Sequence, residues 1–472
     1  MRIAVLVHSA VRNDARITKE AMSLRAAGHD VVIHGIAPDG RRHRELLPGS
    51  DVPLWLEPRV SRVGQWRRRG LLLGVVLTAA LLVLGVAAHI LALSGQQLVL
   101  SALVAGGFAL AAAWPARHRL ARMALHLDDF VASRWRLVVS SAERPVADCG
   151  LPLARGYHDI ARALLSSVAR GAAPEAIHIH DHVALVLAGA LKQRYGVPIV
   201  WDAHEIYQDL AGGDAARAAE NAAIIAACQR HIDHFITINH SIARFYAEHY
   251  PALPPAVVVM NATLPETVPV YDGRLHDAAG VPATQKILLF QGRFSTHRGL
   301  EQLVAAAATL RADWTLVMMG WGGLEASLRI LAAQHLRDGA LATVFLPGVP
   351  QRELQQWSAG ASLGVVPYEN TSLNHLYCTP NKLWEYPSAG VPILCTDLPE
   401  MAAMVSEFGF GTLLPRSFAA ADIARVVNAL DDETLVALRA RCAPFIASNN
   451  WLQWERALLA VYCGLESGRT VK

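Results

Sequence analysis

The loop at residues 291–299 (QGRFSTHRG) carries two arginines five residues apart, Arg293 and Arg298, and each lies beside a glycine. It follows a predicted strand and precedes a predicted helix. Guanidinium groups neutralise a diphosphate, and the free N–H groups at a helix start bind its oxygens. The pattern favours a diphosphate site that includes Gly292, although a solvated basic loop explains this segment about as well when it is taken alone.

Residues 378–386 (CTPNKLWEY) have the composition of a helix start. Thr379 is expected at the N-cap, with a proline at the first helical position. The free N–H groups of this turn, together with Asn381 and Lys382, are then placed to hold a phosphate. Glu385, one turn further on, is placed to accept hydrogen bonds from ribose hydroxyls. A solvated helix face is the alternative for Glu385, but its neighbours are apolar, which favours a position facing a ligand.

Residues 319–325 (MGWGGLE) read as a strand end, a glycine-rich turn and a helix. Gly320 and Gly322 permit the close approach of a ligand backbone or phosphate. The segment lacks the full dinucleotide fingerprint and has no Walker lysine. The sequence therefore supports neither an NAD site nor a P-loop.

Residues 201–205 (WDAHE) place His204 near two carboxylates, Asp202 and Glu205, at the end of a predicted strand. Such a cluster suits sugar hydroxyls or proton transfer; a structural histidine is the alternative.

Residues 178–182 (HIHDH) raise the question of a metal. Alternation along a strand puts His178 and His180 on one face and leaves His182 in the next element. We therefore expect no metal site there.

Strand-like apolar runs alternate with helical stretches through most of the chain, which is typical of α/β proteins with doubly wound parallel sheets. Strands are predicted at residues 3–8, 31–36, 176–180, 198–203, 235–238 and 257–260, and again at 287–291, 315–319, 343–346, 363–366, 393–396 and 412–414. Helices are predicted at 17–27 and 183–195, with a glycine at each C-terminal stop. Two such domains enclose a cleft, and ligands bind beyond the carboxyl ends of their strands.

The same pattern divides the chain. We predict an N-terminal domain over residues 1–262, a linker over 263–283 and a C-terminal domain over 284–449. An amphipathic helix follows within residues 450–472, with Trp454, Leu458, Leu459 and Tyr462 on its apolar side.

The first domain is interrupted at residues 71–114 by two apolar runs, 71–93 and 98–114, joined by a polar turn. Roughly 20 apolar residues are needed to cross a bilayer as a helix. Arginines flank both outer ends, which keeps both on the cytoplasmic side. We therefore predict an inserted two-helix transmembrane hairpin, with a shallow re-entrant hairpin or a buried helical hairpin as alternatives. On this reading the protein lies at the cytoplasmic membrane, with both globular domains on the cytoplasmic side.

The overall composition argues against a nucleic-acid-binding protein and against a small zinc- or disulfide-stabilised protein. A formal net charge of +3 and a charged fraction of 18% give no nucleic-acid footprint. The six cysteines are scattered, which fits a reducing compartment and argues against a zinc ribbon or a disulfide framework. The first residues lead directly into a strand-like run, so no signal peptide is expected.

Taken together, these segments resemble the family 4 glycosyltransferases, retaining enzymes of the GT-B fold with two Rossmann-like domains. The resemblance covers nearly the whole chain apart from the hairpin and its flanks. It is carried by residues 14–29 (DARITKE, then LRAAGH), 179–182 (IHDH), 202–205 (DAHE), 292–299, 380–386 (PNKLWEY) and the last helix from Trp454. In this fold the last helix crosses back to the first domain.

The resemblance implies a nucleotide-sugar donor bound by the second domain and an acceptor bound by the first. It makes Arg293, Arg298, His204 and Glu385 the catalytic residues. The implied donor-binding residues are Gly292, Gly320, Gly322, Thr379, Asn381, Lys382 and Glu385. The implied acceptor-side residues are Asp14, Arg16, Asp202 and Glu205. The implied mechanism is front-face substitution with retention, and it needs neither an enzymatic nucleophile, nor a metal, nor any cofactor beyond the donor itself.

Two positions depart from the family pattern. Lysine is usual where Arg298 stands, and the first of two glutamates spaced by seven residues is replaced by Tyr377. The leading hypothesis is a membrane-anchored hexosyltransferase acting on a lipid-linked acceptor, a polyprenyl-diphosphate glycan or a glycolipid, in polysaccharide or envelope biosynthesis. A non-catalytic membrane scaffold and a sugar-nucleotide epimerase of similar fold are the alternatives.

Overall fold

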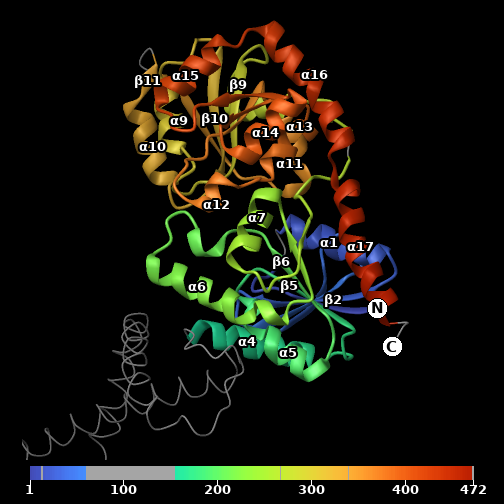
Figure 1. Ribbon diagram of the computed structural model, residues 1–472. Helices are drawn as coiled ribbons and strands as arrows, with labels where there is room; N and C mark the ends of the chain where they lie inside the picture. Colours follow the sequence, from blue (N-terminus) through green and yellow to red (C-terminus); the bar gives the residue numbers. More distant parts are fainter. Residues whose placement is uncertain (12–13, 60–154, 266, 338–339, 470–472) are drawn as a thin grey trace, which may run out of the picture.

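The computed structural model describes the chain apart from residues 12–13, 60–154, 266, 338–339 and 470–472. It consists of two α/β domains, one above the other in Figure 1, each built around its own sheet. The first sheet has eight strands in the order β3-β4-β2-β1-β5-β6-β7-β8, and all its pairs are parallel except β3 with β4. Its strands are β1 (Arg2–Leu6), β2 (Asp30–Ala37), β3 (His43–Leu46), β4 (Pro53–Pro58), β5 (Ala176–His180), β6 (Ile199–Ala203), β7 (His234–Thr237) and β8 (Ala256–Val258).

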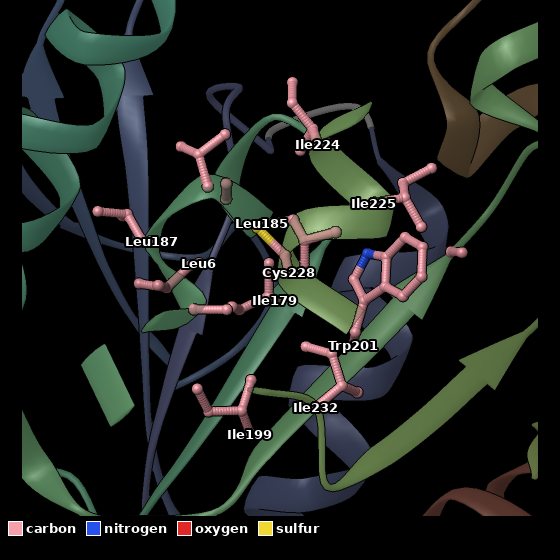
Figure 2. Close-up of a cluster of buried hydrophobic side chains, with 14 of the residues drawn as sticks. Leu6, Ile179, Leu185, Leu187, Ile199, Trp201, Ile224, Ile225, Cys228 and Ile232 are labelled. Atoms are coloured by element: carbon pink, nitrogen blue, oxygen red, sulfur yellow. The ribbon is translucent and has the colours of Figure 1, made fainter. Parts of the chain in front are cut away.

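Alternate residues of β1 enter opposite cores of this domain. Leu6 belongs to the cluster drawn in Figure 2, where Ile179 and Trp201 from neighbouring strands pack against side chains such as Ile225. Val5 belongs to the cluster on the other face of the sheet. Successive side chains of a strand point to opposite faces of the sheet, so apolar residues on both faces allow helices to pack on both sides. The helices are α1 (Ala15–Ala26), α4 (Arg155–Val168), α5 (Ala188–Tyr195), α6 (Ala215–Cys228) and α7 (His240–His249), with short 3₁₀ turns η1 (Ala184–Leu187), η2 (Tyr207–Asp209) and η3 (Gln229–His231).

The second sheet is fully parallel, with six strands in the order β13-β10-β9-β14-β15-β16. This is the doubly wound order, in which the direction of winding reverses between the first strand and its neighbour. The strands are β9 (Lys286–Arg293), β10 (Trp314–Trp321), β13 (Thr343–Pro347), β14 (Leu363–Val366), β15 (Ile393–Thr396) and β16 (Gly411–Leu414); β11 (Leu336–Arg337) and β12 (Ala340–Leu341) pair separately. The helices are α8 (Arg274–Ala279), α9 (Leu300–Ala307), α10 (Glu325–Gln334), α11 (Gln351–Ser358), α12 (Leu373–Leu376), α13 (Lys382–Ser388), α14 (Pro399–Phe408), α15 (Ala420–Ala429) and α16 (Asp432–Ser448).

The last helix, α17 (Trp451–Arg469), returns from the second domain and lies beside α1 in Figure 1. Leu458 and Tyr462 are buried in the core that α1 shares with the first sheet. The Trp451 indole N–H donates to the Ser23 hydroxyl at 2.9 Å. The chain therefore joins the two domains twice, once before α8 and once before α17.

All the predicted strands are present, and the two-domain α/β fold is confirmed. Strands β3 and β4 were not predicted, and α8 lies inside the segment that was predicted as a linker.

The transmembrane part of the predicted fold class is corrected. Residues 71–114 lie outside the described residues, and no helix in the described part of the chain is long and apolar enough to cross a membrane. The predicted location at the cytoplasmic membrane rested on that hairpin and is withdrawn with it.

Candidate active site

The loop at residues 291–299 continues from the end of β9, as the sequence predicts. Arg293 is exposed, and no hydrogen bond or ion pair joins its side chain to the described residues. The Arg298 guanidinium lies 5.2 Å from the centre of the Tyr368 ring, on the loop that follows β14. Strands β9 and β14 are neighbours at the point where the sheet reverses its winding, which is where such sheets bind ligands.

Lys382 brings a third cation to the same place. Its ammonium nitrogen lies 3.2 Å from where a side chain on Gly292 would begin, and 5.8 Å from the centre of the Tyr368 ring. The residue is only 8% exposed. Among the described residues no carboxylate pairs with Lys382, Arg293 or Arg298. A buried ammonium without an anionic partner is costly, so this arrangement favours an anionic ligand.

Glu385 is held beside these cations by two amide groups. The Gln291 side-chain N–H donates to one carboxylate oxygen at 3.1 Å, and that of Gln351 donates to the other at 3.3 Å. Gln291 is itself fixed, because its carbonyl oxygen accepts from the Ser358 hydroxyl at 2.6 Å. The Glu385 carboxylate therefore has a defined position from which it can accept hydrogen bonds from a diol such as ribose.

Gly320 and Gly322 serve the backbone packing of this region. A side chain at Gly320 would meet the carbonyl of Gly292, and one at Gly322, where φ is 153°, would meet the backbone of Phe294. The Phe294 N–H donates to the Trp321 carbonyl at 2.6 Å. Both glycines thus let the loops after β9 and β10 lie against each other, and their contact with a donor stays a prediction.

The predicted helix start at Thr379 is wrong by two residues. Helix α13 begins at Lys382 with Asn381 at its N-cap, and the exposed Asn381 side chain makes no capping hydrogen bond. The Thr379 hydroxyl instead accepts from the Asn239 side chain of the first domain at 3.3 Å. A tertiary partner across the domain boundary has replaced the local cap that the sequence pattern indicated.

Asn239 also contacts Tyr377, the residue at the position of the missing glutamate. Its side-chain N–H also donates to the Tyr377 carbonyl at 2.7 Å, and the Tyr377 ring packs against the core of the first domain. Two further hydrogen bonds cross nearby, from the Ile206 N–H to Asn374 at 2.8 Å and from the Leu373 N–H to Asp209 at 2.7 Å. The position that resembled a missing glutamate is therefore part of the contact between the domains.

On the acceptor side, Arg16 and Asp202 neutralise each other. The guanidinium donates to both carboxylate oxygens at 2.8 Å, and both residues are buried. Asp14 caps α1 by accepting from the backbone N–H groups of Arg16 and Ile17. Of the predicted acceptor-side residues only Glu205 is exposed, and it lies on the side facing Arg298 of the second domain. The assignment of these residues to the acceptor stays a prediction.

His204 lies between two carboxylates. Its Nε2 is 3.0 Å from Asp202 and its Nδ1 is 3.4 Å from Asp181. Burial alone would lower the pKa of His204, but the charges of Asp202 and Asp181 outweigh it and raise the pKa to about 9. The ring is therefore an imidazolium near neutral pH. On the sequence alone, we considered Asp181 only within residues 178–182, as part of a metal site that we rejected. Its contact with His204 depends on tertiary structure and could not be read from the sequence.

A buried group beneath His204 offers atoms that suit a metal: Glu20, His178, His180 and Asp202, all within 4.8 Å of one another. The Arg16 guanidinium already occupies this space, with its Nε 3.0 Å from Glu20 and 2.8 Å from Asp202. The two imidazole rings stack 4.4 Å apart, and their Nε2 atoms both face Glu20 Oε2, at 3.6 Å for His178 and 3.9 Å for His180. These residues do not fit a metal, and Arg16 supplies the positive charge instead.

Comparisons with known proteins agree with this geometry. Residues 285–432 match the family described as Glycosyl transferases group 1. The D-inositol 3-phosphate glycosyltransferase of Thermobispora bispora is 27% identical over 313 residues, which cover 61% of this chain and 70% of that protein. The enzyme of the same name from a Nocardioides species is 27% identical over 284 residues, covering 54% and 60% of the two chains.

Two solved structures share the fold. Sucrose-phosphate synthase from Thermosynechococcus elongatus superposes with a TM-score of 0.67 at 14% identity, covering 99% of this chain and 100% of that one. Anabaena HepE in complex with UDP and glucose gives a TM-score of 0.60 at 12% identity, covering 98% and 100%. The matched segment and the curated relatives support a glycosyltransferase, and the two solved structures show the GT-B arrangement of two Rossmann-like domains.

Proposed function

We propose that this protein transfers a sugar from a nucleoside-diphosphate sugar to an acceptor hydroxyl, with retention of configuration. The observation that carries the proposal is the group of three cations, Arg293, Arg298 and Lys382, which have no carboxylate partner among the described residues. They lie at the switch point of the second sheet, beside the fixed carboxylate of Glu385. A diphosphate with an attached ribose has the matching charge and hydroxyls.

The donor is proposed to bind the second domain through groups of three kinds. The cations bind the diphosphate and stabilise the negative charge that grows on it as it leaves, for which one such donor contributes about 3 kcal/mol. Glu385 accepts from the ribose hydroxyls. Trp321, 58% exposed at the end of β10 and flanked by glycines, offers a ring face for the base. Such stacking contributes roughly 1–3 kcal/mol per base.

The transfer itself is proposed to follow a front-face path. The acceptor oxygen bonds to the anomeric carbon as the bond from that carbon to the phosphate oxygen breaks, and the acceptor proton passes to the departing phosphate. No protein nucleophile is required, and the three cations carry the charge-neutralising role that a metal has in other transferases.

The acceptor is proposed to lie on the first domain, next to the carboxyl ends of β1, β5 and β6. The lipid-linked acceptor predicted from the sequence rested on the membrane hairpin and is not carried further. The names of the relatives direct the first trial to D-inositol 3-phosphate, a small phosphorylated polyol.

The purified protein should therefore be tested with UDP-, GDP-, ADP- and dTDP-sugars, with and without D-inositol 3-phosphate and a lipid extract. The expected result is nucleotide release from one donor that depends on one acceptor. Arg293→Ala should reduce turnover at least 100-fold with the fold retained. Arg352→Ala is the matched control, because that side chain is 82% exposed and, within the described residues, pairs with no carboxylate but its neighbour Glu353. Equal activity in Arg293→Ala would refute the assignment.

Binding of nucleotide without consumption of any donor would instead favour the non-catalytic alternative. A free, altered nucleotide-sugar as product would favour the epimerase.

A further inference from the structure

Asp181 follows β5 in a backbone conformation that few residues with a side chain adopt. Its φ is 60°, in the left-handed region that is unfavourable for a residue with a side chain. Its backbone is fixed on both sides: its N–H donates to the Asp202 carbonyl at 3.1 Å, and its carbonyl accepts from the Trp201 indole at 3.0 Å. Interactions from the neighbouring strand β6 therefore offset the strain and fix the direction of the carboxylate.

The two oxygens of this carboxylate have different surroundings. Oδ1 accepts from the Tyr207 hydroxyl at 2.7 Å and lies 3.4 Å from His204 Nδ1. The Tyr207 oxygen in turn accepts from the His204 backbone N–H at 2.9 Å, which directs the tyrosine proton toward Asp181. Among the described residues, the one polar side-chain contact of Oδ2 is with His8 at 3.5 Å, and the His8 side chain is 40% exposed. One oxygen is thus committed to the protein, and the other is available to a hydroxyl from outside.

Asp202 and Arg16 hold the His204 ring on the side away from Asp181. Asp202 Oδ2 lies 3.0 Å from its Nε2, and Arg16 fixes Asp202 through two hydrogen bonds. Burial alone would raise the pKa of Asp202, but Arg16 and His204 outweigh it and keep that pKa well below its usual range. A carboxylate faces each ring nitrogen, so both carry a proton that points into the protein. An imidazole in this state cannot accept a proton from a substrate.

Asp181 is ionised in the same network. Burial alone would raise its pKa, but the neighbouring His204 and His8 outweigh it and lower the pKa of the carboxyl. Glu205, on the loop after β6, and His180 and His182, on either side of Asp181, are the other titratable groups around it. An ionised carboxylate accepts hydrogen bonds only, which suits the hydroxyl of an acceptor.

We propose that the Asp181 carboxylate binds and orients the acceptor hydroxyl, and that His204, held by Asp202, keeps this carboxylate in place. The proposal rests on the transferase function proposed above and names a residue for its acceptor half. His204, Asp202 and Arg16 are positioning residues, and Asp181 accepts a hydrogen bond without taking the proton. The acceptor is a polyol or a sugar, recognised through its hydroxyl groups.

The test measures acceptor binding and donor binding separately. In Asp181→Asn the acceptor KM should rise at least 10-fold, while UDP affinity stays within 2-fold of the wild type. Arg16→Lys, which loses the two-pronged contact with Asp202, should raise the acceptor KM less and leave UDP affinity unchanged. Asp51→Asn is the control, because that exposed aspartate lies at the surface, where the structure pairs it with Arg25. An unchanged acceptor KM in Asp181→Asn, or an equal loss of UDP affinity, would overturn the proposal.

A second measurement needs no acceptor. Nitrogen NMR of the histidine-labelled protein, with His204→Gln to assign the signal, should show both ring nitrogens of His204 protonated at pH 7.5. A neutral ring would overturn the positioning role even in an active enzyme. If the wild type binds no nucleotide at all, the transferase proposal fails by itself, and the histidine signal still decides the state of this network.

Discussion

Lys382→Met gives the sharpest test of the donor site, because it should make the free protein more stable and the enzyme worse. The ammonium is 8% exposed, has no carboxylate partner among the described residues, and lies 5.6 Å and 5.8 Å from the ring centres of Phe290 and Tyr368. Each ring contributes about 1 kcal/mol. Burying an unpaired charge costs several kcal/mol. The methionine side chain is unbranched and only one heavy atom shorter than that of lysine, and it removes the charge, so a net stabilisation of about 1–3 kcal/mol is expected without ligand.

In contrast to the stability of the free protein, the affinity of Lys382→Met for a nucleotide should decrease. A hydrogen bond to a charged group contributes about 1.5–3 kcal/mol, so the UDP affinity of Lys382→Met should fall about 10- to 100-fold. The assay is thermal unfolding with and without UDP, which should give a higher midpoint for the free variant and a smaller shift on adding nucleotide. Lys286→Met is the matched control, since Lys286 starts the same strand, β9, but is paired with Asp313 at 2.8 Å and Asp432 at 2.6 Å. A less stable free variant with unchanged UDP affinity would refute the reasoning.

Three further outcomes are expected. Gly299→Ala should destabilise the protein by at least about 2 kcal/mol in urea unfolding, because φ is 65° and the new methyl group would meet the Pro367 carbonyl. Trp321→Ala should weaken donor binding about 5- to 100-fold in a calorimetric titration without lowering the unfolding midpoint. The raised pKa of His204 gives stability that is full below about pH 6.5 and is lost as the pH rises through about 9. This amounts to about 3 kcal/mol, and urea unfolding at pH 6 and pH 9.5 should show a smaller difference in His204→Gln.

The sequence predicted the parts of this structure that depend on local pattern. Buried parallel strands are continuous apolar runs, so β5, β14 and β15 were located to the residue. Strands β3 and β4 were missed because the outer strand β3 has a half-exposed, charged pattern that carries no such signal. The cap at Thr379 was misassigned because a first-domain partner, Asn239, lies 140 positions away in sequence and competes with the local pattern.

The candidate site shows why residue type alone could not complete the assignment. Arg16 and Arg298 were both predicted as functional arginines, one for each substrate. The structure distinguishes them by their partners: Arg16 is neutralised by Asp202 at two 2.8 Å contacts, whereas Arg298 lies over the Tyr368 ring and pairs with no carboxylate in the described part of the chain. Arg16 is buried, and the fold supplies the compensating charge that a buried charge needs; Arg298 is half-buried, and its charge is left available to an anionic ligand. We therefore expect a substrate to contact the arginine left without an anion, and that property depends on tertiary pairs that no spacing in the sequence records.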